Sequence, residues 1–229
     1  MTNFATEIEL HENAATSAAP DFNNIARVYR WMEWLTFGPF LQRCRCAFLS
    51  RLSERRNGLI LGDGDGRFTA RLLHANSAVM VDTIDASESM LRQLASRTPA
   101  HRVRIHIADA RTFRPPRSDY DLIATHFFLD CLTDAEVRNL AYRLRNHVGP
   151  DAVWVISEFA IPSNLYGQAI ARPLISALYR AFGLLTNLGI RQLPNYRLAL
   201  SQSGWSLVHR RRWLAGLLVS ELWRSDPNL

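Results

Sequence analysis

Residues 59–68 read Leu-Ile-Leu-Gly-Asp-Gly-Asp-Gly-Arg-Phe. The apolar residues at 59–61 indicate a buried strand, and the spacing within Phe68–Ala75 indicates that a helix follows the glycines directly. Glycines in this place let the backbone come close to a ligand, and the first turn of the helix offers N–H groups without partners. Alone, the run indicates only that a nucleotide binds here.

Short apolar runs and helical patterns alternate after this loop. Six further strands are predicted, at 79–84, 103–107, 121–125, 153–159, 205–214 and 217–223. Helices are predicted between them, at 89–97, 134–148 and 196–202. This order favours an α/β fold with a doubly wound, mostly parallel, seven-stranded sheet of the Rossmann-like type. The last two strands are joined by Ala215-Gly216 and predict an antiparallel hairpin at a sheet edge.

The chain outside this pattern is divided between a tail and two added helical regions. Residues 1–20 are polar without an apolar period and predict a flexible tail. We expect residues 21–229 to form one α/β domain, since 229 residues are few for two domains. The stretch 21–52 has a helical period broken at Gly38-Pro39, and 165–190 is helical with interruptions at Pro173 and Gly183. We expect both regions to cover the open edge of the sheet and to build a binding pocket there.

The composition excludes several common enzyme classes. The chain carries no lysine, so all 27 basic residues are arginine and the net charge is +6. A Walker A loop, a pyridoxal enzyme and a short-chain dehydrogenase each need a lysine. The arginines are scattered and accompany no nucleic-acid motif, so no nucleic-acid partner is expected. Three cysteines, two of them as Cys44-x-Cys46, make a poor zinc site, and no metal is expected.

The sequence predicts a cytoplasmic protein. Acidic residues at 7, 9 and 12 stand where a signal peptide would be basic or apolar. No apolar stretch reaches the roughly 18–20 residues that span a bilayer. The basic balance leaves peripheral contact with an anionic membrane open, and the oligomeric state is open too.

Two acids follow strands of the predicted sheet. Asp85 ends the second strand, where a carboxylate can accept hydrogen bonds from both hydroxyls of a ribose. Asp109 follows the third strand, where it can meet the exocyclic amine of an adenine. Ligands of doubly wound folds bind at this carboxyl edge. The simpler alternative is that both acids only cap the helices that follow.

With these residues, the sequence resembles the class I S-adenosylmethionine-dependent methyltransferases from about Asp21 onward. The matching stretches are 59–68, Asp-Ala-Ser-Glu-Ser-Met-Leu at 85–91, Ala-Asp-Ala at 108–110 and Tyr-Asp-Leu-Ile-Ala-Thr-His-Phe-Phe-Leu-Asp at 120–130. The resemblance implies S-adenosylmethionine as cofactor, with the glycine loop at its methionine end, Asp85 at the ribose and Asp109 at the adenine. It implies a cofactor site formed by Tyr29, Gly62, Asp63, Gly64, Gly66, Asp85, Ala86, Met90, Asp109, Ala110, Thr125 and His126.

One position departs from the family pattern. The family usually has an acid two residues before the first glycine, and this chain has Ile60. We expect Asp63 or Asp65 to take over its task. Residues 25–34 are similar to the start of quinone-biosynthesis C-methyltransferases and their small-molecule relatives, although these often have Tyr-Asp where this chain has Tyr29-Arg30.

Three residues after strands four and five are candidates for removing a proton from the acceptor. His126 comes first because strand four ends beside the expected sulfonium, with a packed histidine as its simpler interpretation. Asp130 and Glu158 follow. The aromatic character of the two added regions favours a flat or lipophilic acceptor. Thr125-His126-Phe127-Phe128 differs from the Asn/Asp-Pro-Pro-Tyr pattern of enzymes that methylate amino groups of adenine or glutamine.

The sequence therefore predicts a methyltransferase that acts on an O or C atom of a small molecule. An alternative is a catalytically degenerate, cofactor-binding protein that serves as a partner or regulator. A third hypothesis, a nicotinamide-dependent oxidoreductase, fits less well, because its loop favours Gly-x-Gly-x-x-Gly and this chain already has Gly66 one position early, before Arg67.

Overall fold

The computed structural model describes residues 38–162, 169, 173 and 193–226 of the chain. The predicted tail, the first part of the 21–52 region with Tyr29, and nearly all of 165–190 lie outside these residues. The predictions for these parts stay predictions.

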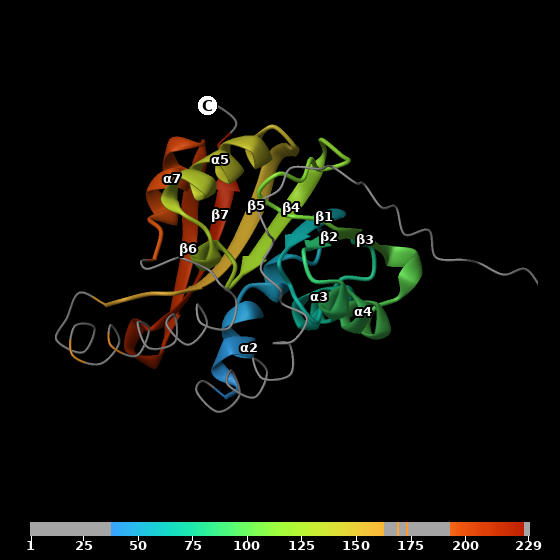
Figure 1. Cartoon of the computed structure of the whole chain (residues 1–229), viewed down its shortest axis with the longest axis horizontal. Helices are drawn as coiled ribbons and strands as arrows, with labels where there is room; N and C mark the ends of the chain where they lie inside the picture. Colours follow the sequence, from blue (N-terminus) through green and yellow to red (C-terminus); the bar gives the residue numbers. More distant parts are fainter. Residues whose placement is uncertain (1–37, 163–168, 170–172, 174–192, 227–229) are drawn as a thin grey trace, which may run out of the picture.

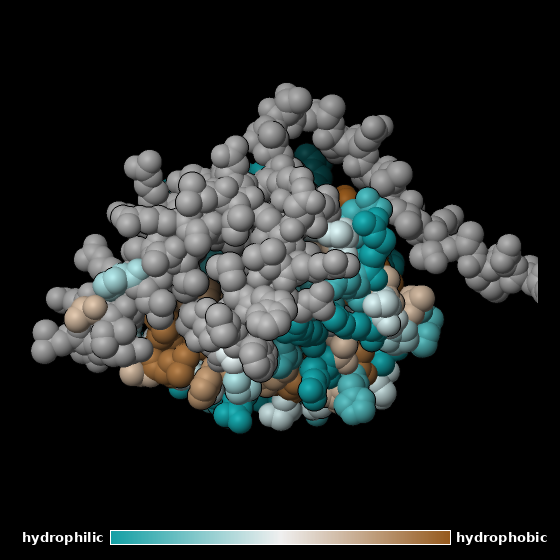
Figure 2. All heavy atoms as spheres, turned by 60° about the horizontal axis from the view of Figure 1, so that its bottom comes forward, coloured by the Kyte–Doolittle hydropathy of each residue, from teal (hydrophilic) through white to brown (hydrophobic). Residues whose placement is uncertain are grey.

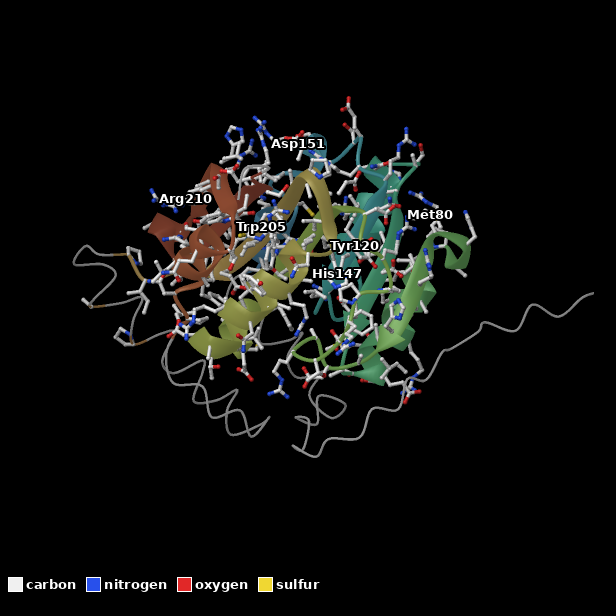
Figure 3. All side chains as sticks on the ribbon, turned by 90° about the horizontal axis from the view of Figure 1, so that it is seen from above. Met80, Tyr120, His147, Asp151, Trp205 and Arg210 are labelled. Carbon is white, nitrogen blue, oxygen red and sulfur yellow. The ribbon has the colours of Figure 1, made fainter. Side chains whose placement is uncertain are left out.

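The described part contains one seven-stranded sheet with the order β3-β2-β1-β4-β5-β7-β6. The strands are β1 Asn57–Leu61, β2 Met80–Asp85, β3 Val103–Ile107, β4 Tyr120–His126, β5 Val148–Phe159, β6 Trp205–Trp213 and β7 Leu218–Ser225. The first five pair in parallel, and β7 pairs antiparallel with both β5 and β6. This confirms the predicted fold class. In Figure 3, Met80 of β2 and Arg210 of β6 lie toward opposite ends of the sheet.

Helices lie on both faces of the sheet (Figure 1). The α-helices are α2 Phe40–Arg45, α3 Arg67–Ala75, α4 Glu88–Arg97, α5 Asp134–Arg145 and α7 Tyr196–Gln202. Short 3-10 helices are Leu49–Arg51, Ala100–Arg102, Leu129–Cys131 and Leu214–Gly216. Helices α3 and α4 share one buried apolar cluster with the sheet through residues such as Phe68, Leu72 and Leu94. Helices α5 and α7 share another on the opposite face, through residues such as Leu140 and Leu200.

A third, smaller apolar cluster lies where β4 and β5 end. Its buried members are Leu41, Cys44, Phe127, Leu217 and Leu218. Partly buried residues pack against it, namely Phe40, Phe159, Leu193, Trp213 and Leu214. The cluster therefore joins α2 to the carboxyl end of β5 and to the β6–β7 hairpin. Figure 2 turns the bottom of Figure 1 forward and shows brown, hydrophobic residues on the part of this face that is not grey.

Two element predictions were wrong in detail. After the break at Gly38-Pro39, the helical period predicted a helix up to Leu52, but α2 ends at Arg45. The chain goes on in tight turns, in which Ala47, Leu49 and Arg51 donate to carbonyls three residues back. Cys44, Phe48 and Leu52 are still buried, because successive tight turns and an α-helix place apolar residues at similar intervals. The predicted helix 134–148 ends at Arg145, and β5 begins at Val148.

Candidate active site

The glycine loop links β1 to α3 at the carboxyl edge of the sheet. Gly62, Gly64 and Gly66 have φ angles of +68°, +58° and +79°, in the left-handed region that glycine adopts without strain. A Cβ atom at Gly62 would lie 2.4 Å from Cδ2 of Phe128, and one at Gly66 would lie 2.6 Å from Cγ of Leu94. The loop thus needs glycine both for its backbone angles and for its close contacts with neighbouring side chains.

The Asp63 side chain binds the start of the helix that follows the loop. Its carboxylate accepts hydrogen bonds from the backbone N (2.9 Å) and the hydroxyl (2.6 Å) of Thr69, so it caps the first turn of α3. Burial raises the pKa of this carboxyl to about 6, against the opposing effect of the Thr69 hydrogen bonds. Asp63 is therefore a structural part of the loop in this structure, and any contact with the cofactor stays a prediction.

Asp65 is held by two arginines. Its carboxylate forms ion pairs with Arg67 (3.0 Å) and Arg97 (2.6 Å). Ile60 is fully buried in the apolar cluster beneath α3. Both acids that we expected to compensate for Ile60 thus bind groups of the protein itself.

Asp85 joins the end of β2 to the glycine loop. One carboxylate oxygen accepts from the Gly64 backbone N (3.2 Å) and the other from the Ser87 backbone N (2.9 Å). Burial raises the pKa of Asp85, and these two hydrogen bonds act against the shift. Ala86 next to it is exposed. Met90, in the first turn of α4, brings its sulfur to 3.8 Å from the position a Cβ would take at Gly64. The structure thus brings Asp85, Met90 and the loop together, as the sequence indicated.

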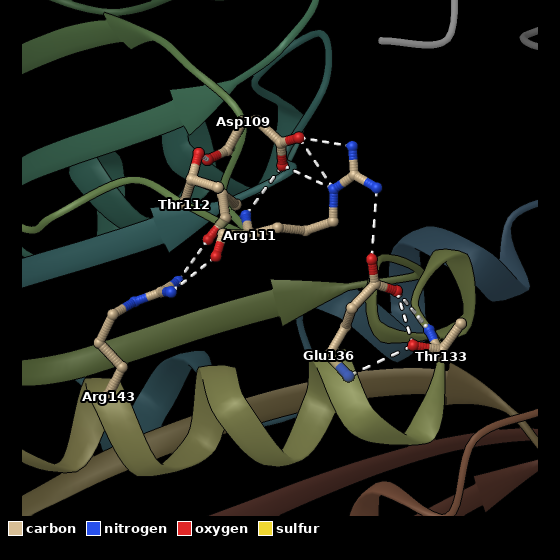
Figure 4. A network of polar contacts seen from close by, with 7 residues as sticks. Asp109, Arg111, Thr112, Thr133, Glu136 and Arg143 are labelled. Atoms are coloured by element: carbon tan, nitrogen blue, oxygen red, sulfur yellow. Dashed lines mark hydrogen bonds and ion pairs between the residues drawn. The ribbon is translucent and has the colours of Figure 1, made fainter. Parts of the chain in front are cut away.

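Asp109 lies after β3 and binds Arg111, as Figure 4 shows. The Arg111 Nε donates to both carboxylate oxygens (3.0 and 2.8 Å), and its Nη2 donates to Oδ2 (2.6 Å). The Arg111 backbone N also donates to Oδ1 (2.9 Å). The Asp109 side chain is nevertheless 32% exposed, and its contact with an adenine stays a prediction. Ala110 is buried.

Thr125 and His126, the last residues of β4, point into the protein. The Thr125 hydroxyl accepts from the Trp154 indole N–H (3.0 Å). His126 is 4% exposed, packs edge-on against Phe68 and contacts the Ser157 hydroxyl through Nδ1 (3.0 Å). Burial lowers the pKa of His126 well below its ordinary value. His126 is thus packed among buried side chains, and its role as a base stays a prediction.

Glu158 and Asp130 are also buried, at 1% and 5% exposure. One Glu158 oxygen accepts from the backbone N–H groups of Phe128 (3.1 Å) and Leu129 (2.8 Å). Burial, and then the nearby charge of Asp130, raises the pKa of Glu158 well above its ordinary value. Glu158 therefore fixes the turn after β4, in which Phe127 has a φ of +55° and Phe128 reaches Gly62.

The sequence interpretation missed two residues of this edge, Phe128 and Arg111. Phe128 lies against Gly62, and Arg111 occupies the carboxylate of Asp109. Phe128 stands inside the stretch 120–130 that carries the family resemblance, and Arg111 directly follows the stretch 108–110. The contact of Phe128 joins separate strands and could not be read from local spacing. Among the residues that the structure describes, no group of three or more His, Cys, Asp or Glu side chains could hold a metal ion.

Comparison with known families decides the class of the loop-bearing segment. Residues 59–151, from β1 to the first part of β5, match the family model of a methyltransferase domain. This segment is similar to a methyltransferase domain. The match agrees with S-adenosylmethionine as the cofactor, which the glycine loop and the two acids indicated. A comparison with curated proteins found no significant match.

Solved methyltransferases share the fold at low sequence identity. The mitomycin 7-O-methyltransferase MmcR is 16% identical with a TM-score of 0.66, and the alignment covers 90% of this chain and 60% of MmcR. A putative O-methyltransferase from Nostoc punctiforme is 15% identical with a TM-score of 0.68, with 92% and 63% covered. The N-methyltransferase NodS from Bradyrhizobium japonicum, solved with S-adenosyl-L-homocysteine, is 18% identical with a TM-score of 0.58, with 81% and 87% covered.

These proteins differ in length from this chain. The chain spans less than two thirds of MmcR and of the Nostoc protein. Within the described residues, no helix is long and apolar enough to cross a membrane.

Proposed function

We propose that the methyltransferase domain transfers the methyl group of S-adenosylmethionine to an O or C atom of a small aromatic or lipophilic molecule. The observation that carries the proposal is the hydrogen bond from the Gly64 N–H to Asp85, because it joins the glycine loop to the acid that we propose for the ribose. Asp109 follows β3, one strand further from the glycine loop than Asp85 on β2. This order matches a cofactor whose ribose lies between its methionine end and its adenine. Asp85 would hold the ribose hydroxyls, Asp109 the adenine amine, and the loop the methionine end.

The apolar cluster at the ends of β4 and β5 supports a lipophilic acceptor. Phe127 and Phe159 pack with ring centroids 5.0 Å apart, and Phe40 and Trp213 remain partly exposed beside them. Apolar and aromatic linings are typical of pockets for small organic ligands. The names of MmcR and the Nostoc protein, both O-methyltransferases, agree with this class of reaction.

We propose that none of the three candidate bases has to remove the proton during transfer. His126, Asp130 and Glu158 are each at most 5% exposed. Methyl transfer from a sulfonium is an in-line displacement that mainly requires alignment of acceptor and methyl group. An electron-rich carbon or an already ionised oxygen meets this requirement. The His126→Gln variant should then keep turnover within a few-fold of the original, whereas loss of turnover with intact cofactor affinity would restore His126 as the base.

A second candidate function is that of a catalytically degenerate protein that binds the cofactor and serves as a partner or regulator. The burial of His126, Asp130 and Glu158 favours it too, because a protein without catalysis needs no accessible base. Release of S-adenosyl-L-homocysteine, measured with a panel of phenols, quinols and polyketide-like acceptors, separates the two. Turnover with any acceptor supports the enzyme. Cofactor binding without turnover across the panel supports the degenerate protein.

The cofactor site can be tested apart from turnover. The Asp85→Ala variant should bind S-adenosyl-L-homocysteine more weakly by roughly 1–3 kcal/mol, through lost charge-assisted hydrogen bonds. Glu88→Ala is the matched control, since Glu88 is an exposed acid three residues along that pairs only with Arg92 among the contacts described. Equal affinity of the two variants would remove Asp85 from the site.

A further inference from the structure

Arg111 makes an unusually complete contact with the acid that we propose for adenine. Two nitrogens of its guanidinium and its own backbone N donate to the Asp109 carboxylate, at 2.6–3.0 Å (Figure 4). Such a fork fixes the plane of a carboxylate as well as its position, which a single donor cannot do. The Nε–H group is shared between the two oxygens, so the three Arg111 N–H groups leave about one of the four acceptor sites of the carboxylate for a further donor.

The backbone of this loop is fixed without the Arg111 side chain. The Asp109 carbonyl accepts from the backbone N–H groups of Thr112 (3.0 Å) and Phe113 (2.8 Å). Arg143 of α5 donates to the carbonyls of Ala110 and Arg111, at 2.6 Å each. Loss of the Arg111 guanidinium therefore leaves the turn in place and releases mainly the side-chain torsions of Asp109.

The Arg111 guanidinium is itself held from the other side. Its Nη1 contacts Glu136 (3.3 Å), which forms a capping box with Thr133 at the start of α5. Arg111 thus lies between Asp109 and the start of α5. Burial alone would raise the pKa of Asp109, but the hydrogen bonds and charge of Arg111 outweigh it and lower that pKa. Asp109 therefore stays a carboxylate, an acceptor only.

We propose that Arg111 is a positioning residue that orients the Asp109 carboxylate toward the exocyclic amine of the adenine and so sets the selectivity for adenine over hypoxanthine. The inference rests on the proposed cofactor site. An amine at carbon 6 donates to a carboxylate, whereas the oxygen at carbon 6 of hypoxanthine places two acceptors against each other. A site built around a hydrogen bond rejects an analogue that cannot form it far more strongly than an apolar pocket does.

The test compares two ligands on each variant by calorimetry: S-adenosyl-L-homocysteine and S-inosyl-L-homocysteine, which has the oxygen in place of the amine. We expect the original protein to prefer the adenosine ligand by about a hundredfold or more. Arg111→Ala should lower this preference by about tenfold, mainly through weaker binding of the adenosine ligand. Because both ligands are measured on one protein, a general loss of stability cancels in the ratio.

Two further variants sharpen the readout. Arg138→Ala removes the same charge from an exposed position of α5 and should leave the ratio unchanged. In the Asp109→Ala background, Arg111→Ala should have no further effect on the ratio, since the two residues act through one another. If Arg111→Ala fails to fold, Arg111→Lys keeps the charge but supplies no fork, and it should give a smaller fall in the ratio.

Three results would overturn the inference. An unchanged ratio in Arg111→Ala would show that Arg111 has no part in reading the base. An equal weakening of both ligands would make Arg111 a support of the loop only. Tighter binding of the adenosine ligand would make Arg111 a competitor for Asp109. If the original protein bound neither ligand, the proposed cofactor site would fail with it, and this outcome is distinct from the other three.

Discussion

Gly62 and Phe128 meet across the boundary between β1 and β4, and this contact governs the shape of the glycine loop. A Cβ at position 62 would lie 2.4 Å from the Phe128 ring, at a φ of +68°. We therefore predict that Gly62→Ala lowers the free energy of unfolding by about 2–4 kcal/mol through overpacking and backbone strain. Cofactor affinity should fall with it. Urea denaturation and calorimetry measure the two effects.

Two variants separate the clash from the backbone strain. Gly149→Ala is the control, because a Cβ there meets nothing within 4 Å, and its effect should stay within about 1 kcal/mol. Adding Phe128→Ala to Gly62→Ala should remove the clash and leave the strain. A Gly62→Ala protein as stable as the Gly149→Ala protein would contradict this account of the loop.

Asp63 gives the loop a dependence on pH. Its pKa is raised from 3.8 to about 6, so the folded state binds the proton more tightly than the unfolded state does. This contribution to stability is present below about pH 4 and is lost as the pH rises through about 6. The difference in unfolding free energy between the original protein and Asp63→Asn should change by on the order of 1–3 kcal/mol over that range. A constant difference would mean that Asp63 titrates normally.

Single residues at this edge were predictable to different degrees. The glycines and Asp85 stand at fixed places relative to strands, and the structure brings them together as expected. The capping role of Asp63 was not predictable, because its partner Thr69 lies six residues away, across the loop. The partner of Phe128 depends on which strands are neighbours, and this follows from the sheet order rather than from local pattern.

The β6–β7 hairpin carries a buried charge that its strands and α7 share. Glu221 of β7 is fully buried and binds Arg210 of β6, Arg197 of α7 and the Trp223 indole N–H. Removing one partner of a buried ion pair leaves the other charge without compensation. We predict that Glu221→Gln lowers the free energy of unfolding by about 3 kcal/mol, measured by urea denaturation.

An exposed ion pair provides the comparison. Glu88 and Arg92 are paired on α4 with side chains 60% and 66% exposed. Glu88→Gln should change the free energy of unfolding by less than about 1 kcal/mol. Equal effects of the two substitutions would show that Glu221 is solvated and that the hairpin is held by its apolar contacts alone.

At the scale of elements, the apolar runs predicted all seven strands within a few residues. The largest error in a strand was β5, which begins at Val148, five residues before the predicted start. The sequence does not predict this start, because the strand there contains Gly149, Pro150 and Asp151, which are unfavourable in strands. Helix α2 shows the opposite problem, because apolar spacing cannot separate an α-helix from successive tight turns.

At the scale of the whole molecule, the sheet order decides which chemistry can meet. Strands β3, β2, β1 and β4 are neighbours, so the groups after them share one edge. The acids on β2 and β3 therefore lie on one side of the glycine loop, and the apolar cluster at β4 and β5 lies on the other. This division fits a cofactor held by polar groups and an acceptor held by apolar ones.

The central claim is that this edge holds S-adenosylmethionine. Titration of the full chain with S-adenosyl-L-homocysteine, with NAD in a parallel cell, tests it most directly, because it needs no knowledge of the acceptor. We predict one binding site for the sulfur ligand, with a dissociation constant in the range of about 1–100 μM, and no heat from NAD beyond dilution. Binding of NAD without binding of S-adenosyl-L-homocysteine would contradict the account.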